Sequence, residues 1–130
     1  MIGLDTNVLV RFLTQDDTAQ SPRANRLMSS LTAINPGFIS TVAIIELDWV
    51  LDSFYGFSKP DRAAAIMRLL SNDCLLVENE HDVFVAMTAL ADGADFADAL
   101  IGMSGIGVGC EHTVTFNRKA LRLSGFASVP

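Results

Sequence analysis

The sequence predicts an α/β protein built around a parallel sheet that is covered by helices on both faces. Short apolar runs alternate along the chain with longer segments in which apolar residues recur at helical spacing. Parallel strands need such crossovers, so the alternation favours a parallel sheet. The chain has 130 residues, of which 50% are hydrophobic, and it contains no repeat or linker. We therefore expect a single domain over residues 1–130.

The first part of the chain predicts two strands and four helices. Met1–Leu4 is an apolar run, and apolar spacing predicts helices over about residues 7–13 and 19–31. Asn35-Pro36-Gly37 is a turn signal, and it precedes a second short run, Phe38-Ile39, which ends at Ser40-Thr41. Two further helices follow. They cover residues 42–55 and a segment that begins near Pro60, a residue favoured in the first helical turn, and ends at about Ser71.

The second part of the chain continues the alternation. Cys74–Val77 is the third strand candidate, and the helical pattern over residues 83–91 ends at Gly93. Asp95 opens another helix, which we expect to fade among the four glycines between 102 and 109. The remaining predicted elements are a strand over Glu111–Phe116, a short helix over 119–123 and a strand over 126–129. Ligands of parallel sheets bind beyond the carboxyl ends of the strands, so functional residues are expected there.

The composition limits the classes of function. The net charge is −6, from 15 acidic and 9 basic residues, which taken alone argues against nucleic-acid binding because phosphate recognition usually leaves a basic footprint. Cys74 and Cys110 lie far apart and the chain has only two His, so we expect no zinc site but two buried thiols in a reducing compartment. No signal-peptide pattern or membrane-spanning stretch is present, which predicts a cytoplasmic protein without a membrane partner.

Two acidic residues stand out in the first half of the chain. Asp5 follows the first strand, where it is either a helix N-cap or a ligand at the edge of the sheet. Glu46 lies on its predicted helix opposite Asp48 and Asp52, on the apolar face near Val42. A carboxylate on such a face needs a compensating partner, which is either an Arg in a structural ion pair or a metal ion.

Three more polar residues stand out in the second half. Asp95 fits a helix N-cap, and Asp98 then occupies the third helical position, where its short side chain is poorly suited to a capping box. Gly102, one turn beyond Asp98, leaves room beside this carboxylate for an ion or a ligand. Asn117 follows the fourth strand, either as an N-cap or as a ligand.

A parallel sheet would bring these carboxylates and the amide to one edge. Clustered carboxylates cannot all stay ionised without a cation. Hard oxygen donors without thiolate or imidazole suit Mg²⁺ or Mn²⁺. Such ions activate water and hold phosphate oxygens in phosphodiester cleavage, which is the chemistry that the residues indicate.

Four segments resemble the PIN domain family, and within it the VapC-type toxins of toxin–antitoxin pairs. The segments are LDTNVLVRFL at 4–13, ISTVAIIELDWVL at 39–51, ADFADALIG at 94–102 and TVTFNRKA at 113–120. The resemblance implies a three-layer α/β/α sandwich with a central, mainly parallel sheet of four or five strands. It also implies a Mg²⁺- or Mn²⁺-dependent ribonuclease that cuts RNA with activated water.

The resemblance also implies roles for individual residues. Asp5 and Asp98 would hold the metal directly, and Glu46 would act on the metal-bound water or complete the metal's ligand shell. Supporting positions would be filled by polar residues of the same motifs, namely Thr6, Asn7, Ser40 and Asp95.

One position departs from the family pattern. The family's fourth acid is Asn117 here, which can still bind a hard cation through its carbonyl oxygen but brings no charge. This predicts a one-metal or weakened two-metal site, in which Asn117 and Thr115 orient water or the scissile phosphate. The alternative is a catalytically degenerate PIN-fold module that serves in binding or regulation. Arg11, Arg118 and Lys119 are either contacts for RNA phosphates or solvated surface charges.

The resemblance implies two protein partners, a cognate antitoxin that blocks the acidic cleft with a basic side chain and a second copy of the chain in a homodimer. Trp49 and Phe54, on the flanks of the Glu46 helix, either contribute to such contacts or pack in the core. A phosphoacceptor or aspartyl phosphatase is disfavoured, because Asp5-Thr6-Asn7 lacks the second Asp of a phosphatase motif. A bound cation would add positive charge where a phosphate approaches, so the acidity of the chain does not exclude RNA.

Overall fold

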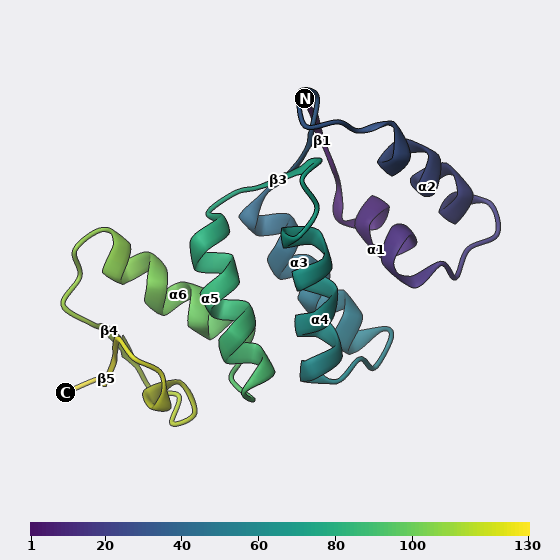
Figure 1. Ribbon diagram of the computed structural model, residues 1–130. Coiled ribbons are helices and arrows are strands. Elements are labelled where there is room, and N and C mark those ends of the chain that lie inside the picture. The colour runs from purple at the N-terminus through teal and green to yellow at the C-terminus, as the bar shows by residue number, and fades with distance from the viewer.

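Figure 1 shows the computed structural model of the protein, which describes residues 1–130. It contains five strands, six α-helices and one 3₁₀ helix. In chain order these are β1 (Ile2–Gly3), α1 (Thr6–Thr14), α2 (Gln20–Ser30), β2 (Gly37–Ile39), α3 (Thr41–Ser53), α4 (Lys59–Leu70), β3 (Leu75–Val77), α5 (Glu80–Ala91), α6 (Phe96–Gly107), β4 (Thr113–Thr115), η1 (Ala120–Arg122) and β5 (Phe126–Ser128). All five predicted strands are present, and the predicted α/β class is confirmed.

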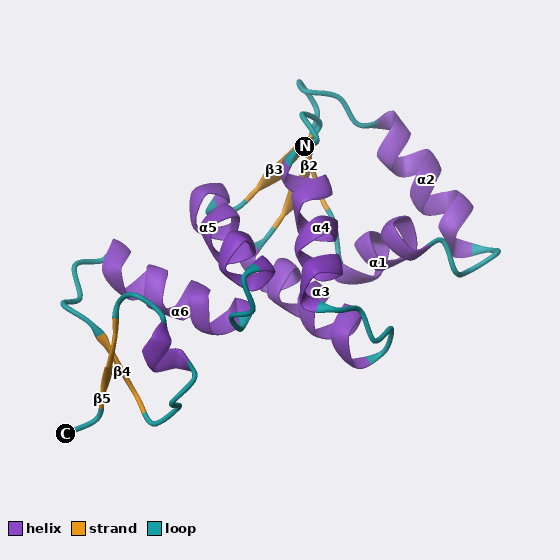
Figure 2. Ribbon diagram, turned by 60° about the horizontal axis from the view of Figure 1, so that its bottom comes forward, coloured by secondary structure: helices purple, strands orange, loops and turns teal.

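The strands form two separate parallel sheets, of three and two strands. The first has the order β1-β2-β3, with Gly37 of β2 paired to Ile2 on one side and Leu75 on the other. The second pairs β4 with β5, and Thr113 lies opposite Phe126. Figures 1 and 2 show the second sheet at the far end of α6, with α5 and α6 between it and β1. The expected single central sheet of four or five strands is therefore divided into three strands plus two.

The hydrophobic core lies between the first sheet and the helices α1 and α3 to α6, with a contribution from Met28 of α2. Its fully buried side chains come from most elements of the chain and include Leu9, Ile39, Ile44, Leu47, Leu51, Ile66, Leu69, Val83, Leu90 and Phe96. α1 and α2 form a helical hairpin at one end of the molecule (Figure 1). Only the first half of α6 reaches the core, through Phe96, Ala99 and Leu100.

Local signals explain why several helices begin where they do. Ser40 Oγ accepts a hydrogen bond from the amide of Ala43 at 3.1 Å at the start of α3. Ser58 Oγ does the same for the amide of Asp61 at 3.2 Å at the start of α4, where Pro60 lies in the first turn. Gly93 follows α5 with a φ of 102°, a conformation that L side chains rarely adopt, and this allows the sharp turn into α6.

α6 ends at Gly107, within the glycine-rich segment where the sequence predicts that it fades. It continues through the first two of these glycines, Gly102 and Gly105, which lie against side chains of the second sheet. A Cβ atom at 102 would lie 2.7 Å from Cε2 of Phe126, and one at 105 would lie 2.8 Å from Oγ1 of Thr113. The glycines therefore allow close packing, which offsets their low helix propensity.

Four residues are less buried than their core interpretation requires. Cys110 is exposed and Cys74 is half-buried, so the expected pair of buried thiols is wrong. Trp49 and Phe54 are exposed and contact each other edge to face, with ring centroids 5.7 Å apart. Core packing of these two rings is therefore also excluded. No helix is both long enough and apolar enough to cross a membrane.

Candidate functional site

Asp5 follows β1 and occupies the N-cap position of α1. Its backbone is extended, as N-cap residues require, but its side chain makes no capping hydrogen bond and is exposed. Both carboxylate oxygens thus remain free to bind a ligand. Thr6 is buried beneath it, whereas Asn7 is exposed at the surface of α1.

Glu46 lies on an exposed face of α3. It lines a shallow groove with Val42, Ile45 and Trp49, and it forms no ion pair. The alternative of a structural Arg partner for Glu46 is therefore wrong. Val42 and Trp49 beside it are exposed, whereas Ile45 is half-buried and packs against the core, so Glu46 lies at the edge of the core and not within it.

The structural ion pair of α3 involves Asp48 instead. Arg62 of α4 donates from Nε to Asp48 Oδ1 at 2.8 Å and from Nη1 to the Phe57 carbonyl at 2.6 Å, and it lies 3.4 Å from Asp52. Burial raises the pKa of Asp48, although the Arg62 hydrogen bond and charge oppose this shift. Helical spacing places Asp48 on a solvent face, so this ion pair was not predicted from the sequence.

The largest gathering of charged side chains lies where α6 begins. A cavity of about 670 Å³ is lined by the acidic and amide residues Asp92, Asp95, Asp98 and Asn117 and by the cationic residues Lys59, Lys119 and Arg122. Asp95 Oδ1 accepts a hydrogen bond from the amide of Asp98 at 2.8 Å, so Asp95 is the N-cap of α6. Burial raises the pKa of Asp98, and the nearby Asp95 carboxylate raises it further.

Asn117 is held in this cavity by a tight turn after β4. Its amide nitrogen donates to Thr115 Oγ1 at 3.0 Å, and its Oδ1 accepts from the amide of Lys119 at 3.0 Å. Thr115 therefore positions Asn117, and Asn117 in turn positions the backbone of Lys119. Arg118, between them, is exposed and does not line the cavity.

The space beside Asp98 differs from the expectation. The position one helical turn along, Gly102, is covered by the ring of Phe126 from β5. Gly102 therefore accommodates a side chain of the second sheet, and the expectation that it leaves room for an ion or ligand is wrong.

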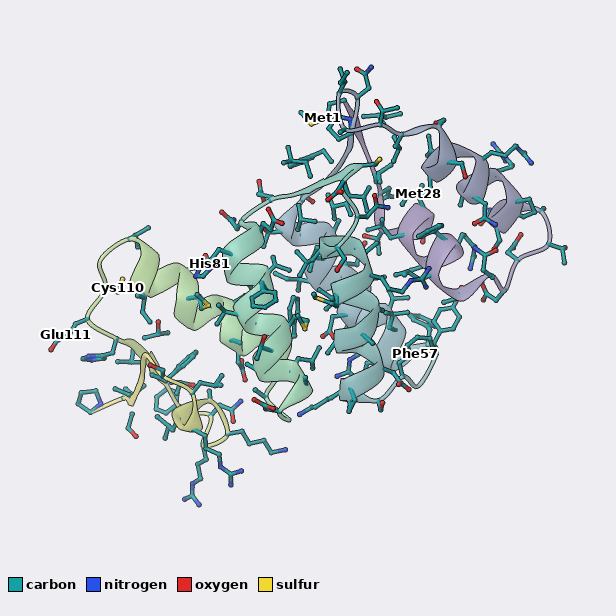
Figure 3. All side chains as sticks on the ribbon, viewed as in Figure 1. Met1, Met28, Phe57, His81, Cys110 and Glu111 are labelled. Atoms are coloured by element: carbon teal, nitrogen blue, oxygen red, sulfur yellow. The ribbon has the colours of Figure 1, made fainter.

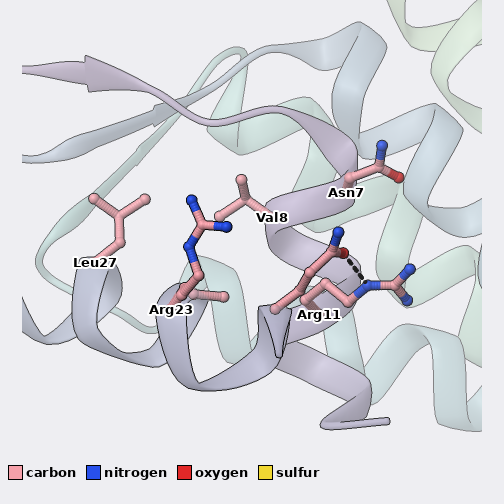
Figure 4. Close-up of a pocket in the computed structure, with 7 residues that line it drawn as sticks. Asn7, Val8, Arg11, Arg23 and Leu27 are labelled. Carbon is pink, nitrogen blue, oxygen red and sulfur yellow. Dashed lines mark hydrogen bonds between the residues drawn. The ribbon is translucent and has the colours of Figure 1, made fainter. Parts of the chain in front are cut away.

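Arg11 lies far from these acids along the chain, in a second cavity between α1 and α2 (Figure 4). Its Nε donates to Gln20 Oε1 at 2.7 Å, and its Nη1 donates to the Tyr55 hydroxyl at 3.2 Å and contacts Asp16 at 3.4 Å. Arg23 lines the same cavity without an ion-pair partner. Arg11 is thus largely committed to structural contacts.

The acidic and amide residues of the predicted site lie in three places, namely the cavity at the start of α6, the start of α1 and the exposed face of α3. The structure brings Asp95, Asp98, Asn117 and Lys119 together in one cavity, whereas Asp5 and Glu46 lie outside it. No three Asp, Glu, His or Cys side chains are close enough to hold one metal ion. Lys59 and Arg122 are cavity residues that the sequence analysis missed, because neither belongs to a recognisable motif.

Comparison with known families bears on these residues. The sequence profile of the PIN domain matches residues 2–125. The chain belongs to the PIN domain family. PIN domains are generally metal-dependent nucleases. Searches of curated proteins and of solved structures found no match.

The donor chemistry of this PIN domain fits a divalent cation. Asp95, Asp98 and Asn117 offer carboxylate and amide oxygens, and no thiolate or imidazole lines the cavity. The nearby Asp95 carboxylate disfavours the ionised form of Asp98. A bound cation would offset the repulsion between these two carboxylates.

Proposed function

We propose that this PIN domain is a Mg²⁺- or Mn²⁺-dependent endoribonuclease that hydrolyses phosphodiester bonds of RNA. The observation that carries the proposal is the cavity at the start of α6, which is lined both by acidic and amide side chains and by three cationic side chains. Oxygen donors suit a hard cation, and Lys or Arg side chains suit phosphate groups. Few other functions need both in one place.

Asp98 and Asn117 would hold the cation, with Asp95 as their support. Asp5 and Glu46, the other acids of the family motif, would complete the donor set. When bound, the cation supplies positive charge for the phosphate oxygens and lowers the pKa of a coordinated water.

The side chains of the chain have separable tasks in this proposal. Lys119 and Arg122 bind the RNA phosphate, and Lys59 is tied to the carbonyl of Gly93 and so fixes the rim of the cavity. Asn117 provides an oxygen without charge, which weakens attraction for a second cation. Thr115 keeps Asn117 in position through its hydroxyl group.

The proposal is tested by RNA cleavage with Mg²⁺ or Mn²⁺, comparing the wild type with Asp98→Asn. We expect Asp98→Asn to lower the rate by about 100-fold or more, since even supporting residues of metal sites contribute about 10–100-fold. Asp73→Asn is the matched control, because it removes an exposed carboxylate outside the cavity. Unchanged cleavage by Asp98→Asn would show that the assigned site is wrong.

The second candidate function is a degenerate PIN-fold module for binding or regulation, which the uncharged Asn117 favours. Asn117→Asp separates the two candidates. If the wild type is inert and Asn117→Asp cleaves RNA, the degenerate function is correct. Calorimetric titration with Mn²⁺ adds an independent measurement, with Asp5→Ala as the comparison variant.

We also propose that the protein is the toxin of a toxin–antitoxin pair. The support is the VapC-like sequence of the four motifs and an acidic cavity that a basic side chain of an antitoxin could enter. Expression of the wild type in a bacterial host should arrest growth, and Asp98→Asn should not. Equal growth of both strains at equal protein levels would contradict the toxin role.

A further inference from the structure

The first sheet ends at an unpaired edge. In β1, the amides of Ile2 and Leu4 donate to the carbonyls of Pro36 and Phe38 beside and within β2, at 3.1 and 2.8 Å. Successive residues of a strand direct their amide and carbonyl groups to opposite sides, so those of Gly3 point away from β2. No strand pairs with β1 on that side. Ile2 is 48% exposed there, which is unusual for a large apolar residue in a sheet.

The second sheet has a matching free edge. We define the C-terminal arm as residues 108–130, which contain β4, η1 and β5. In β4, Thr113 and Thr115 bond to residues flanking β5, so Val114 between them faces outward. Val114 is 52% exposed and Phe116 is 88% exposed. In β5, Phe126 packs against Gly102 of α6, whereas the large exposed apolar side chains of this sheet lie on and directly after β4, so β4 is the apolar edge.

The total accessible surface of the chain is larger than that of a compact monomer of the same mass. Its accessible area is 7650 Å², whereas a compact monomer of 14.0 kDa exposes about 6,700 Å². The excess of about 950 Å² is close to the roughly 800 Å² that each partner contributes to a standard protein interface. Fifteen large hydrophobic side chains are exposed, and they lie both on the body of the chain and on the arm.

The arm cannot reach β1 of its own chain in this arrangement. Phe96 and Leu100 anchor the first half of α6 in the core, and the second half carries the arm away from it. Figure 3 shows Cys110 and Glu111, at the end of α6, on the opposite side of the molecule from Met1 and Met28. Closing the sheet within one chain would require α6 to leave its core contacts.

We infer that two copies of the chain exchange their C-terminal arms, each β4 pairing with the free edge of the other copy's β1. The exchange is reciprocal, so it closes as a symmetric dimer and leaves no free β1 edge. It joins three strands of one copy to two of the other, and it gives the uncovered apolar residues of the arm a partner surface.

The pairing has a consequence for the site, and this part of the inference rests on the proposed function. If β4 runs parallel to β1, as in every strand pair of the molecule, the ends of the two strands coincide. Asp5 lies two positions after the last residue of β1, and Asn117 lies two positions after the last residue of β4. Because Asn117 shares its cavity with Asp95 and Asp98, the pairing brings these residues to Asp5 of the other copy. Each active site would then combine residues from both chains.

The pairing is tested by light scattering and by disulfide cross-linking, neither of which needs activity. We expect the wild type to have twice the mass of the 14.0 kDa chain. Gly3→Cys and Val114→Cys are introduced together, with Cys74→Ala and Cys110→Ser to remove the native thiols. A Cβ atom at Gly3 meets nothing within 4 Å, so this substitution is tolerated. On mild oxidation we expect a covalent dimer on a denaturing gel.

Three results would overturn the pairing. The first is a monomeric mass at all concentrations, and the second is an intrachain disulfide in the double variant. The third is cross-linking no greater than that of a control variant. This control carries Gly3→Cys together with Ala64→Cys, an exposed site on α4. Mixing chains that carry only Gly3→Cys with chains that carry only Val114→Cys should also give covalent dimers, because the linked residues come from different copies.

The composite site is tested by mixing two inactive variants, Asp5→Asn and Asp98→Asn, after unfolding and joint refolding. Half of the dimers are then mixed, and each has one intact site, so about a quarter of the wild-type cleavage rate is expected. No recovery with normal cross-linking would overturn the shared site and leave the pairing intact. No cleavage by the wild type, with normal cross-linking, would instead contradict the proposed nuclease function.

Discussion

At the scale of single residues, Arg62 is the one charged side chain buried in the molecule. It joins α3 to α4 through Asp48, and its second nitrogen binds the carbonyl of Phe57 in the connecting loop. Such a pair contributes little compared with an apolar core, but removing one partner leaves a buried charge unpaired. This asymmetry makes Asp48 sensitive to substitution.

We predict that Asp48→Ala lowers the free energy of unfolding by about 3–5 kcal/mol. Urea denaturation followed by circular dichroism measures the change. Asp52→Ala is the matched control, because Asp52 also contacts Arg62 but is largely exposed, and a loss of no more than about 1 kcal/mol is expected. Equal losses for the two variants would show that burial does not control the strength of this ion pair.

Asp95 combines two roles at one position, the N-cap of α6 and a charge beside Asp98. Asp95→Ser should separate them, since Ser caps helices about as well as Asp but carries no charge. We predict stability within about 0.5 kcal/mol of the wild type, and about 1 kcal/mol of destabilisation for Asp95→Ala. In both variants the pKa of Asp98, followed by NMR, should fall towards its ordinary value. An unchanged pKa would show that burial alone raises it.

At the scale of elements, Glu78 connects the end of β3 to the start of α3. Its Oε1 accepts a hydrogen bond from the amide of Thr41 at 2.9 Å, and Asn79 donates to the Thr41 hydroxyl at 3.1 Å. The bond to Thr41 lowers the pKa of Glu78 below its ordinary value of 4.5. The ionised form is therefore the one that stabilises the fold, and it does so next to a helix N-terminus.

We predict that Glu78→Gln destabilises the protein at pH 7 and that this difference disappears in acid. A lowered pKa in the folded state gives stability that is fully present above 4.5 and is lost as the pH falls through the folded value. Urea midpoints of both proteins at pH 7 and near pH 3 measure this. A difference that persists at the lower pH would show that the carboxylate charge is not responsible.

The sequence predicted elements better than their mutual arrangement. Apolar spacing, Pro60 and the caps at Ser40 and Asp95 are local signals, and the helices begin close to where they indicate. The glycine-rich segment also indicated where α6 ends, but the role of Gly102 and Gly105 within the helix was not predictable, because it depends on packing with the second sheet. Helix propensity alone penalises glycine whatever it touches.

The candidate site shows the same difference between local signals and contacts between distant segments. Asp95 and Asp98 lie on one turn of α6, so a local pattern suffices to place them together. Asp5 and Glu46 depend on how distant segments pack, and the structure leaves β1 and β4 in two separate sheets. Motifs identify such residues by type, but a local pattern does not predict how far apart they lie.

At the scale of the whole molecule, the exposed area predicts that stability depends on protein concentration. Subunits that bind each other in the folded state stabilise it by mass action. We therefore predict that the melting temperature rises over a 100-fold increase in concentration. Val114→Lys, which puts a charge on the free edge of β4, should remove the rise, whereas Phe84→Lys, an exposed apolar residue on α5, should retain it. A constant melting temperature in the wild type would contradict dimerisation.

Because Gly102 lies in close contact with Phe126, a substitution at position 102 would change the shape of the proposed assembly. A single added methyl group would lie 2.7 Å from the ring and would force the arm to tilt on α6. Asp98 lies one turn away and keeps its cap partner whichever way the arm tilts. A substitution at position 102 can therefore alter the contact between copies without changing any acidic residue. The dimer contact and the catalytic residues can thus change independently during evolution.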